Sequence, residues 1–358
     1  MSEVNYRNRR ALRIEDGFLR VTMTAEGANI AEIIHKASGV NPLWTPPWPS
    51  IEPSHWSDAA HAEYGASEES RVLASIMGHS ICLDTYGSPS TEEKAAGIPI
   101  HGEGFTLAYE TRGQAKQASV RSALPLAQLV FKRELALGGD EQVAVLRFRE
   151  AVTNLCSFDR PIAWTQHVVL GAPFLEAGGT QVRAAVRESK VIDADFGGAQ
   201  KRAADFLWPY CPKIEGGTID LRKVGETTPS GGFTSHRVDS GGKHGYFVAW
   251  SPSTHIAFGY IWRRADFPWL CRWEENRLRT GAPWNGCTLA LGMEFGVSPF
   301  VESRREMVDR GALFETPSFR WLPARGSIET SYCAFVGSTE SVPEAVQWDG
   351  ADIVRFVM

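Results

Sequence analysis

Apolar and polar residues alternate over much of the chain in short runs, and glycine turns separate the runs. The pattern covers residues 11–44, with turns at Asp-Gly, Glu-Gly and Ser-Gly, and it returns steadily over 105–152. Further strand-like runs cover 247–250, 256–262, 287–295 and 327–336. Period-two alternation broken by glycine turns is typical of successive antiparallel strands. We therefore expect an all-β fold of the sandwich type with few short helices.

Two segments depart from this pattern towards helix. Residues 57–69 are rich in Ala, Glu and His and predict a turn or two of helix. Ser303 and Glu306 have the spacing of a capping box, which predicts a short helix over 304–310 that ends at Gly311. A loop is expected over 225–232. The chain shows neither a nucleotide-binding glycine motif nor alternation of strands with helices, and this disfavours an α/β nucleotide-binding fold.

Residues 42–56 form a proline-rich segment that also carries three tryptophans, Trp44, Trp48 and Trp56. Each proline removes an amide donor that a β-ladder needs, so a stiff loop is expected. The indole rings either pack within this loop or line a cleft in which they stack on a sugar. The chain shows neither a linker nor a repeat of fixed period, so residues 1–358 are expected to form one domain.

Composition limits the kinds of molecule that the protein is expected to bind. The 358 residues are 43% hydrophobic and 22% charged, which suits a protein with a large core, and the net charge of −5 disfavours nucleic acid as a partner. The six cysteines are scattered singly and are expected to be reduced, mostly buried thiols. The first residues lack an apolar signal core, and about eighteen uninterrupted apolar residues occur nowhere. We expect a cytoplasmic protein without a membrane partner.

The stretch 162–176 places one imidazole, His167, within an apolar run that favours a strand. A histidine in this position is either a hydrogen-bonded core residue or a proton carrier where water is scarce. The other six histidines away from candidate stretches lie in polar or loop contexts and are expected at the surface: His35, His55, His61, His236, His244 and His255.

Two further stretches supply partners for His167. Residues 100–104 carry His101, and residues 291–296 carry Glu294 between two large apolar residues. Glu294 is either a carboxylate paired with an arginine or a desolvated base whose pKa burial raises. A carboxylate and an imidazole on opposite sides of a small molecule form a base and acid pair. Such a pair opens a cyclic hemiacetal without a cofactor, since one group takes the proton of the anomeric hydroxyl and the other protonates the ring oxygen.

These three residues resemble the aldose 1-epimerase (galactose mutarotase) family in order and in separation. The likeness rests on His-Gly at 101–102, the single His167 and Leu-Gly-Met-Glu ending at Glu294. It implies an antiparallel β-supersandwich and a small carbohydrate as substrate. It also implies that Glu294 is the base, that His167 is the acid at the ring oxygen, and that His101 positions the sugar. Asp239 is similar to the acidic residue that holds sugar hydroxyls, and the other residues expected to contact the sugar are His79, Glu103, Trp164 and Trp273.

Several residues differ from the family's pattern. Gln166 stands before His167 where the family has Asn, and Val168 with Val169 follows where the family has aromatic residues. His79, between Gly78 and Ser80, replaces an arginine-bearing stretch. Substrate recognition is therefore expected to differ from that of galactose.

Two other functions compete with the epimerase. His101 and Glu103, with His79 and His167, are residue types that bind Mn, Fe or Zn in metal-assisted isomerases and lyases. Neither H-x-H nor H-E-x-x-H is present, so we predict no metal. A protein of the same fold that binds a carbohydrate without catalysis is the remaining alternative, because one fold hosts several functions.

Overall fold

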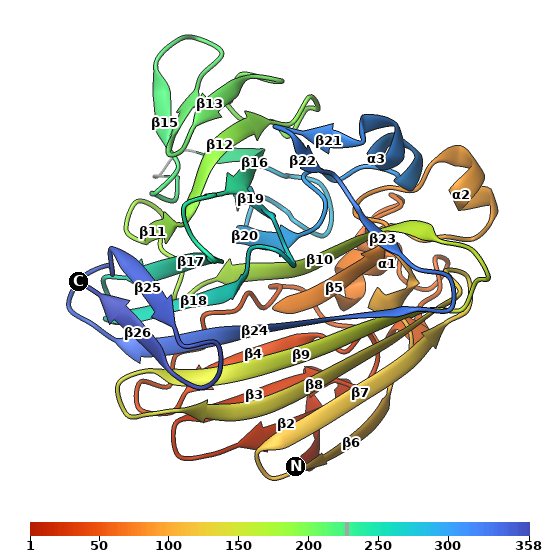
Figure 1. Cartoon of the computed structure of the whole chain (residues 1–358), viewed down its shortest axis with the longest axis horizontal. Helices are drawn as coiled ribbons and strands as arrows, with labels where there is room; N and C mark the ends of the chain where they lie inside the picture. Colours follow the sequence, from red (N-terminus) through yellow and green to blue (C-terminus); the bar gives the residue numbers. More distant parts are fainter. Residues whose placement is uncertain (226–228) are drawn as a thin grey trace.

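A computed structural model describes residues 1–225 and 229–358, and it confirms the all-β class (Figure 1). The predicted loop over 225–232 includes residues 226–228, which lie outside the described part. The larger sheet has twelve strands within the described residues, and each pair of neighbours is antiparallel. In sheet order these strands are β1 (Ser2–Tyr6), β2 (Arg9–Glu15), β3 (Leu19–Thr24), β4 (Ile30–His35), β5 (His79–Asp84), β10 (Arg160–Gly171), β20 (Leu289–Gly296), β19 (Trp269–Asn276), β16 (Ser230–Val238), β12 (Val186–Val191) and β13 (Asp205–Leu207), with β23 (Arg320–Leu322) paired to β10.

The second sheet has eight antiparallel strands in the described residues and stacks on the larger one. Figure 1 shows its long strands passing in front of β2, β3 and β4. In sheet order they are β11 (Gln181–Ala184), β17 (His244–Ser251), β18 (Ile256–Arg263), β24 (Ser327–Ser338), β9 (Ala144–Asn154), β8 (Leu129–Gly139), β7 (Gln117–Leu124) and β6 (Glu110–Gln114). The part of the chain that the structure describes also has three two-stranded ribbons: β14 (Tyr210–Pro212) with β15 (Thr218–Asp220), β21 (Ala312–Leu313) with β22 (Thr316–Pro317), and β25 (Ala345–Trp348) with β26 (Val354–Val357).

Helices are short and few, as expected. Over residues 1–225 and 229–358 they are α1 (Ser70–Ser75), α2 (Thr91–Ala95), α3 (Arg304–Arg310) and the 3-10 turns η1 (Pro53–His55), η2 (Ala62–Tyr64) and η3 (Glu103–Phe105). The capping box that predicted α3 is present, because Ser303 accepts from the Glu306 amide and Glu306 accepts from the Ser303 amide. The helix predicted over 57–69 is instead η2, and the longer α1 begins one residue beyond the predicted range. Within the described residues, no helix is long and apolar enough to cross a membrane.

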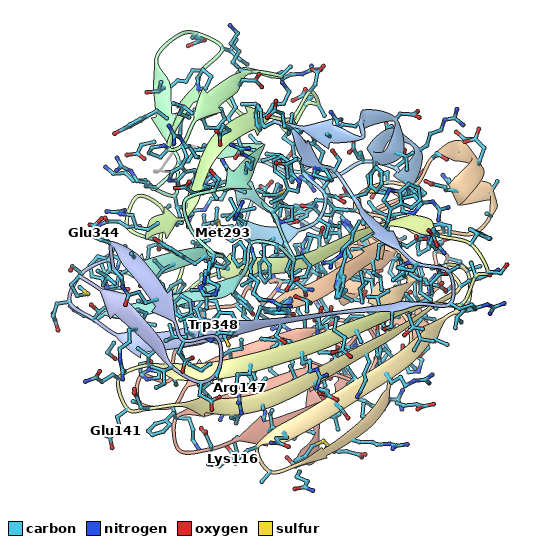
Figure 2. All side chains as sticks on the ribbon, in the orientation of Figure 1. Lys116, Glu141, Arg147, Met293, Glu344 and Trp348 are labelled. Carbon is cyan, nitrogen blue, oxygen red and sulfur yellow. The ribbon has the colours of Figure 1, made fainter. Side chains whose placement is uncertain are left out.

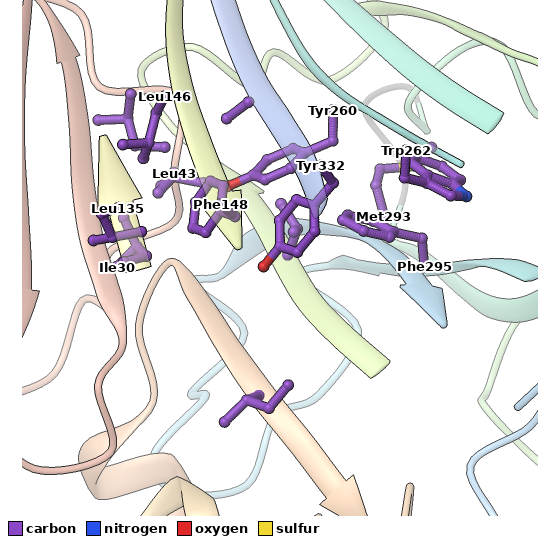
Figure 3. Close-up of a cluster of buried hydrophobic side chains, with 14 of the residues drawn as sticks. Ile30, Leu43, Leu135, Leu146, Phe148, Tyr260, Trp262, Met293, Phe295 and Tyr332 are labelled. Atoms are coloured by element: carbon purple, nitrogen blue, oxygen red, sulfur yellow. The ribbon is translucent and has the colours of Figure 1, made fainter. Parts of the chain in front are cut away.

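Strand alternation divides the side chains of the larger sheet between two faces. On β10 the side chains of Trp164, Val168 and Leu170 belong to a core cluster that includes residues of both sheets. The side chains of Ala163 and Val169 belong to separate clusters on the opposite face. We call the first face inner and the second face outer. Figure 2 shows the side chains of the described residues on the ribbon, and Figure 3 shows aliphatic and aromatic side chains of this inner core.

A buried polar network crosses the inner core. The Arg133 guanidinium donates to Glu150 Oε1 at 2.6 Å and to Gln166 Oε1 at 3.1 Å. Gln166 Nε2 in turn donates to Glu150 Oε2 at 2.6 Å, and the Tyr332 hydroxyl lies 2.6 Å from Glu150 Oε1. Arg133 and Glu150 have no exposed side-chain surface. The pair therefore depends on these contacts in place of hydration.

The surface prediction is wrong for two histidines. His35, at the end of β4, is buried, and its Nδ1 lies 3.0 Å from the Ser38 hydroxyl. His236 is fully buried on β16, where its ring nitrogens contact the hydroxyls of Ser189 and Thr234 at 2.8 and 2.9 Å. The neighbouring strands β12 and β19 cover it on both sides, and such pairing is not visible in the local sequence. The cysteines agree with prediction, since all six are free and five are buried.

Candidate active site

His167 and Glu294 face each other across two neighbouring strands. In the antiparallel pair β10 and β20, Gln166 is opposite Phe295 and Thr165 is opposite Gly296. Continuing this register by one residue places His167 directly opposite Glu294. Directly opposed residues in an antiparallel pair project from the same face of the sheet. Both side chains lie on the outer face, because their neighbours Val168 and Phe295 belong to the inner core.

The carboxylate of Glu294 is held between two polar groups. Its Oε1 lies 3.6 Å from His167 Nε2, and its Oε2 accepts a hydrogen bond of 2.5 Å from the Tyr86 hydroxyl. Glu294 is 2% exposed and His167 is 7% exposed. Burial raises the pKa of Glu294 above its ordinary value, and the nearby His167 and the Tyr86 hydrogen bond offset part of that rise. Glu294 is therefore a stronger base than an exposed carboxylate.

Gly292 leaves the space that this carboxylate occupies. It is two residues before Glu294 on β20 and faces the same side. A Cβ atom at residue 292 would lie 2.5 Å from Glu294 Oε1 and 3.1 Å from Trp273 Cβ. The glycine of the Leu-Gly-Met-Glu sequence is thus explained locally, because any side chain at residue 292 would displace the Glu294 carboxylate.

His101 reaches the same place from a loop. Its backbone has φ +62°, and the following Gly102 has φ +82°, a conformation that favours glycine. A Cβ atom on Gly102 would lie 2.1 Å from the carbonyl oxygen of Leu83 at the end of β5. The His101 ring centroid lies 5.4 Å from that of His167. Desolvation by the surrounding protein and the charge of His167 lower the pKa of His101 to about 3, so its ring is neutral.

The three residues line one cavity of about 230 Å³ on the outer face. One wall is aromatic and aliphatic and consists of Trp44, Val72, Leu73, Ile76, Ile100 and Trp284. A second wall is also apolar and consists of residues of a separate cluster: Ile192, Ala194, Phe196, Phe233 and Val301. Trp273 contacts both groups. The volume is below the roughly 300–1,000 Å³ of pockets for drug-sized ligands and suits a smaller molecule.

Charged side chains occupy the mouth of the cavity. The Arg279 guanidinium carbon lies 5.0 Å from the centre of the Trp284 ring, and Arg279 Nη1 lies 3.2 Å from Glu69 Oε2. Arg279 Nε also lies 3.6 Å from Glu275 Oε2. The side chains of Arg279 and Glu69 are 33% and 44% exposed. The guanidinium is therefore already paired with two carboxylates.

Four residues that were expected to contact the sugar do not line this cavity. Trp164 and His79 project into the inner core, where Trp164 donates to Glu150 and His79 uses both ring nitrogens on Gln166 and Tyr260. The side-chain face of a strand depends on register, and a shift of one residue reverses it.

Glu103 and Asp239 lie elsewhere. Glu103 is buried in η3, where its carboxylate accepts from the Ala127 amide at 2.7 Å. Asp239 follows β16 in a turn and accepts from the Gly241 amide at 3.0 Å, beside a separate hollow. Of the five residues expected to bind the sugar, Trp273 lines the cavity together with His101, His167 and Glu294.

Sequence reasoning missed much of the lining of the site, and the residues Tyr86, Arg279 and Trp284 illustrate why. Tyr86 lies just beyond β5, in a segment that reads as a polar loop, and nothing in its neighbourhood indicates a contact with a residue 208 positions away. Arg279 and Trp284 flank a proline-containing loop without a distinctive motif. Of the proline-rich segment, Trp44 lines the cavity, while Trp48 packs behind it against Trp284 at a centroid distance of 5.0 Å.

The structure also changes the expected geometry of the acid and base pair. The two groups lie side by side on adjacent strands, and not on opposite sides of a six-membered ring. Adjacent placement suits the chemistry, because the anomeric hydroxyl and the ring oxygen of a hemiacetal are bonded to the same carbon. In the described part of the chain, no group of three or more His, Cys, Asp or Glu side chains is arranged to hold a metal ion.

Comparisons by sequence find nothing: no protein-family model and no curated protein matches the chain. Solved structures do match. A Klebsiella pneumoniae protein, provisionally assigned as an aldose 1-epimerase, is 14% identical with a TM-score of 0.62, and the match covers 93% of this chain and 80% of that one.

Two further matches are described as galactose mutarotase-like. The protein from Clostridium acetobutylicum is 15% identical with a TM-score of 0.59, over 94% of this chain and 98% of that one. The protein from Lactobacillus casei is 14% identical with a TM-score of 0.56, over 91% and 99%. At such identities the likeness establishes the fold: the chain is an antiparallel β-sandwich of the galactose mutarotase-like type, as its sequence predicted.

Proposed function

We propose that this protein is a cofactor-free epimerase that interconverts the anomers of an aldose or a sugar derivative. The observation that carries the proposal is the buried pair of Glu294 and His167, 3.6 Å apart at the cavity. A raised carboxyl pKa suits a general base, because proton transfer is efficient when the pKa approaches the working pH. The fold, shared with galactose mutarotase-like proteins, supports the same function.

The proposed reaction needs two proton transfers in each direction. Glu294 takes the proton of the anomeric hydroxyl while His167 donates a proton from Nε2 to the ring oxygen. The bond between the anomeric carbon and the ring oxygen breaks, and an open-chain aldehyde forms. Rotation about the adjacent carbon–carbon bond exposes the other carbonyl face. The reverse transfers then close the ring as the other anomer, and both residues regain their starting protonation.

His101 is proposed to position the sugar. Its neutral ring both donates and accepts hydrogen bonds, and its Nδ1, like that of His167, is buried with no protein partner among the described residues. The hydrogen-bonding capacity of these ring nitrogens, on residues that line the cavity, is therefore not used by the protein.

Glu294→Gln tests the proposed base. The amide preserves the size of the side chain but cannot take a proton, so anomer interconversion should fall by roughly 10²- to 10⁴-fold. The rate is measured by exchange NMR between the two anomeric signals of an aldose, and sugar binding by saturation transfer. Glu340→Gln is the matched control, because its side chain is 93% exposed, and it should retain full activity.

Undiminished turnover in Glu294→Gln would exclude Glu294 as the base. A wild-type protein that binds aldoses without accelerating anomer exchange would instead be a carbohydrate-binding protein of this fold.

A further inference from the structure

The cavity has few polar groups for the hydroxyls of a sugar. Of the polar side chains that line it among the described residues, Glu294 and His167 are assigned to the two oxygens at the anomeric carbon. Arg279 and Glu69 are paired with each other at the mouth. His101 and Ser88 remain for the other hydroxyls, together with the indole N–H donors of the lining tryptophans Trp44, Trp273 and Trp284. The aliphatic side chains that form much of the remaining lining offer no hydrogen-bond partner to a further hydroxyl.

The rest of the surface is apolar on two sides. Val72, Leu73 and Ile100 lie on one wall, and Ile192, Phe233 and Val301 lie on the other. A sugar site that holds equatorial hydroxyls needs polar groups around the edge of the ring, since a hydroxyl buried without a partner is disfavoured. Aliphatic side chains on both walls instead favour carbon and hydrogen at the end of the substrate farthest from the anomeric carbon.

The charges at the mouth disfavour an anionic sugar. Arg279 is the cation among the described lining residues, and it lies within 3.6 Å of carboxylates from both Glu69 and Glu275. A phosphate or carboxylate on the substrate would meet two negative groups and one positive group there. A neutral substrate suits this mouth better.

From this arrangement we propose that the substrate is a neutral deoxy aldose, of the 6-deoxyhexose class, with its methyl end between the two apolar walls. The proposal rests on the proposed function for the identity of the reacting end. The apolar walls determine which end of the substrate lies between them. This part of the proposal holds whether or not the site is catalytic.

Matched pairs of sugars test the proposal. Anomer exchange is measured by NMR with D-galactose against 6-deoxy-D-galactose and with D-glucose against 6-deoxy-D-glucose. One group of methylene size in an apolar pocket changes specificity by about 10- to 200-fold. We therefore expect kcat/KM to be at least about tenfold higher for the 6-deoxy sugar in one pair or both. Equal values, or higher values for the parent hexoses, would overturn the proposal.

A variant of one wall links the preference to the cavity. Val301→Thr keeps the shape of the side chain and adds a hydroxyl on a lining residue. We expect it to lower the ratio of kcat/KM for the 6-deoxy sugar over the parent hexose. Val308→Thr on α3 is the matched control, because Val308 is 39% exposed, and the ratio should not change. An unchanged ratio in a folded Val301→Thr protein would contradict the assigned wall.

Failure of the substrate class and failure of the epimerase function give different results. If neither member of a pair shows accelerated exchange, the proposed function fails, and saturation transfer then compares binding. Tighter binding of the 6-deoxy sugar would still support the apolar walls as its site. Equal or weaker binding of the 6-deoxy sugar, or no binding by either sugar, would overturn the substrate class as well.

Discussion

At the scale of single residues, the environment of Glu294 decides what the site is able to do. Burial raises the pKa of its carboxyl, and the Tyr86 hydroxyl, which donates at 2.5 Å, counteracts part of this rise. Because that hydrogen bond favours the charged carboxylate, the proposed mechanism makes Tyr86 a positioning residue that acts through Glu294. The sequence singled out Glu294 and His167 as polar residues in apolar runs, and His101 by the His-Gly pair of the family resemblance. It did not identify Tyr86, whose role depends on a contact across the fold.

The pH dependence of activity should report this hydrogen bond. In the wild type, kcat/KM should fall as the pH decreases through the raised pKa of Glu294, above the ordinary carboxyl value of 4.5. Tyr86→Phe removes a contact that lowers this pKa, so the acid limb should move to higher pH. The profile is measured by polarimetry or exchange NMR.

Tyr210→Phe is the control for this shift, because Tyr210 is 52% exposed on a peripheral ribbon. A limb that stays in place in Tyr86→Phe, or one that moves to lower pH, would show that Tyr86 does not stabilise the ionised base.

At the scale of the elements, the site depends on the register between β10 and β20. Alternation along each strand predicted that the strands exist and approximately where they end. It could not show which face each side chain occupies, and for this reason Trp164 and His79 were expected at the site while they lie in the inner core. The register places His167 opposite Glu294, and Gly292 leaves room for the carboxylate on the same strand face.

Gly292→Ala should reduce activity without unfolding the protein. The added Cβ would approach Glu294 Oε1 to 2.5 Å, and the end of this side chain is able to move away. A displacement on the order of 1 Å at a catalytic group costs up to about 10²-fold in rate, and we expect a loss of that order in kcat with a similar melting temperature.

Gly17→Ala is the matched substitution for Gly292→Ala, since a Cβ at residue 17 would have no neighbour within 4 Å. Full activity in Gly292→Ala would mean that the observed carboxylate position is not required for turnover.

At the scale of the whole molecule, two stacked sheets support the outer-face cavity from behind. The sheet class was predictable, because alternation is a local property of each strand. The cavity was not, because its walls come from segments near residues 44, 72–76, 100, 192–196, 273–284 and 301, which only the tertiary fold brings together. Gln166, which departs from the family pattern beside His167, lies in the inner polar network and does not contact the cavity. The presence of Gln166 in place of Asn therefore affects the inner polar network that supports the site, and it does not change a side chain that would contact the ligand.

We expect the inner polar network to contribute more to the unfolding free energy than an exposed ion pair does. Arg133→Met would leave Glu150 buried without its cation, and removal of one partner of a buried pair costs about 3–5 kcal/mol of unfolding free energy. Arg149→Met on β9 also removes a salt-bridged arginine, but this pair with Glu329 is more than half exposed, and because solvent screens such a pair the cost should be much smaller. Urea denaturation measures both values. A loss in Arg133→Met no larger than that in Arg149→Met would contradict the importance of the network.

The most direct measurement is the rate of anomer exchange in wild type, Glu294→Gln, His167→Asn and the double variant, with one aldose that the wild type turns over. Residues that act as one unit are non-additive, because loss of either already removes the concerted proton transfer. We predict that the double variant is about as slow as the slower single variant. Rates in which the two losses multiply, or a single variant as fast as wild type, would show that Glu294 and His167 do not work as a pair.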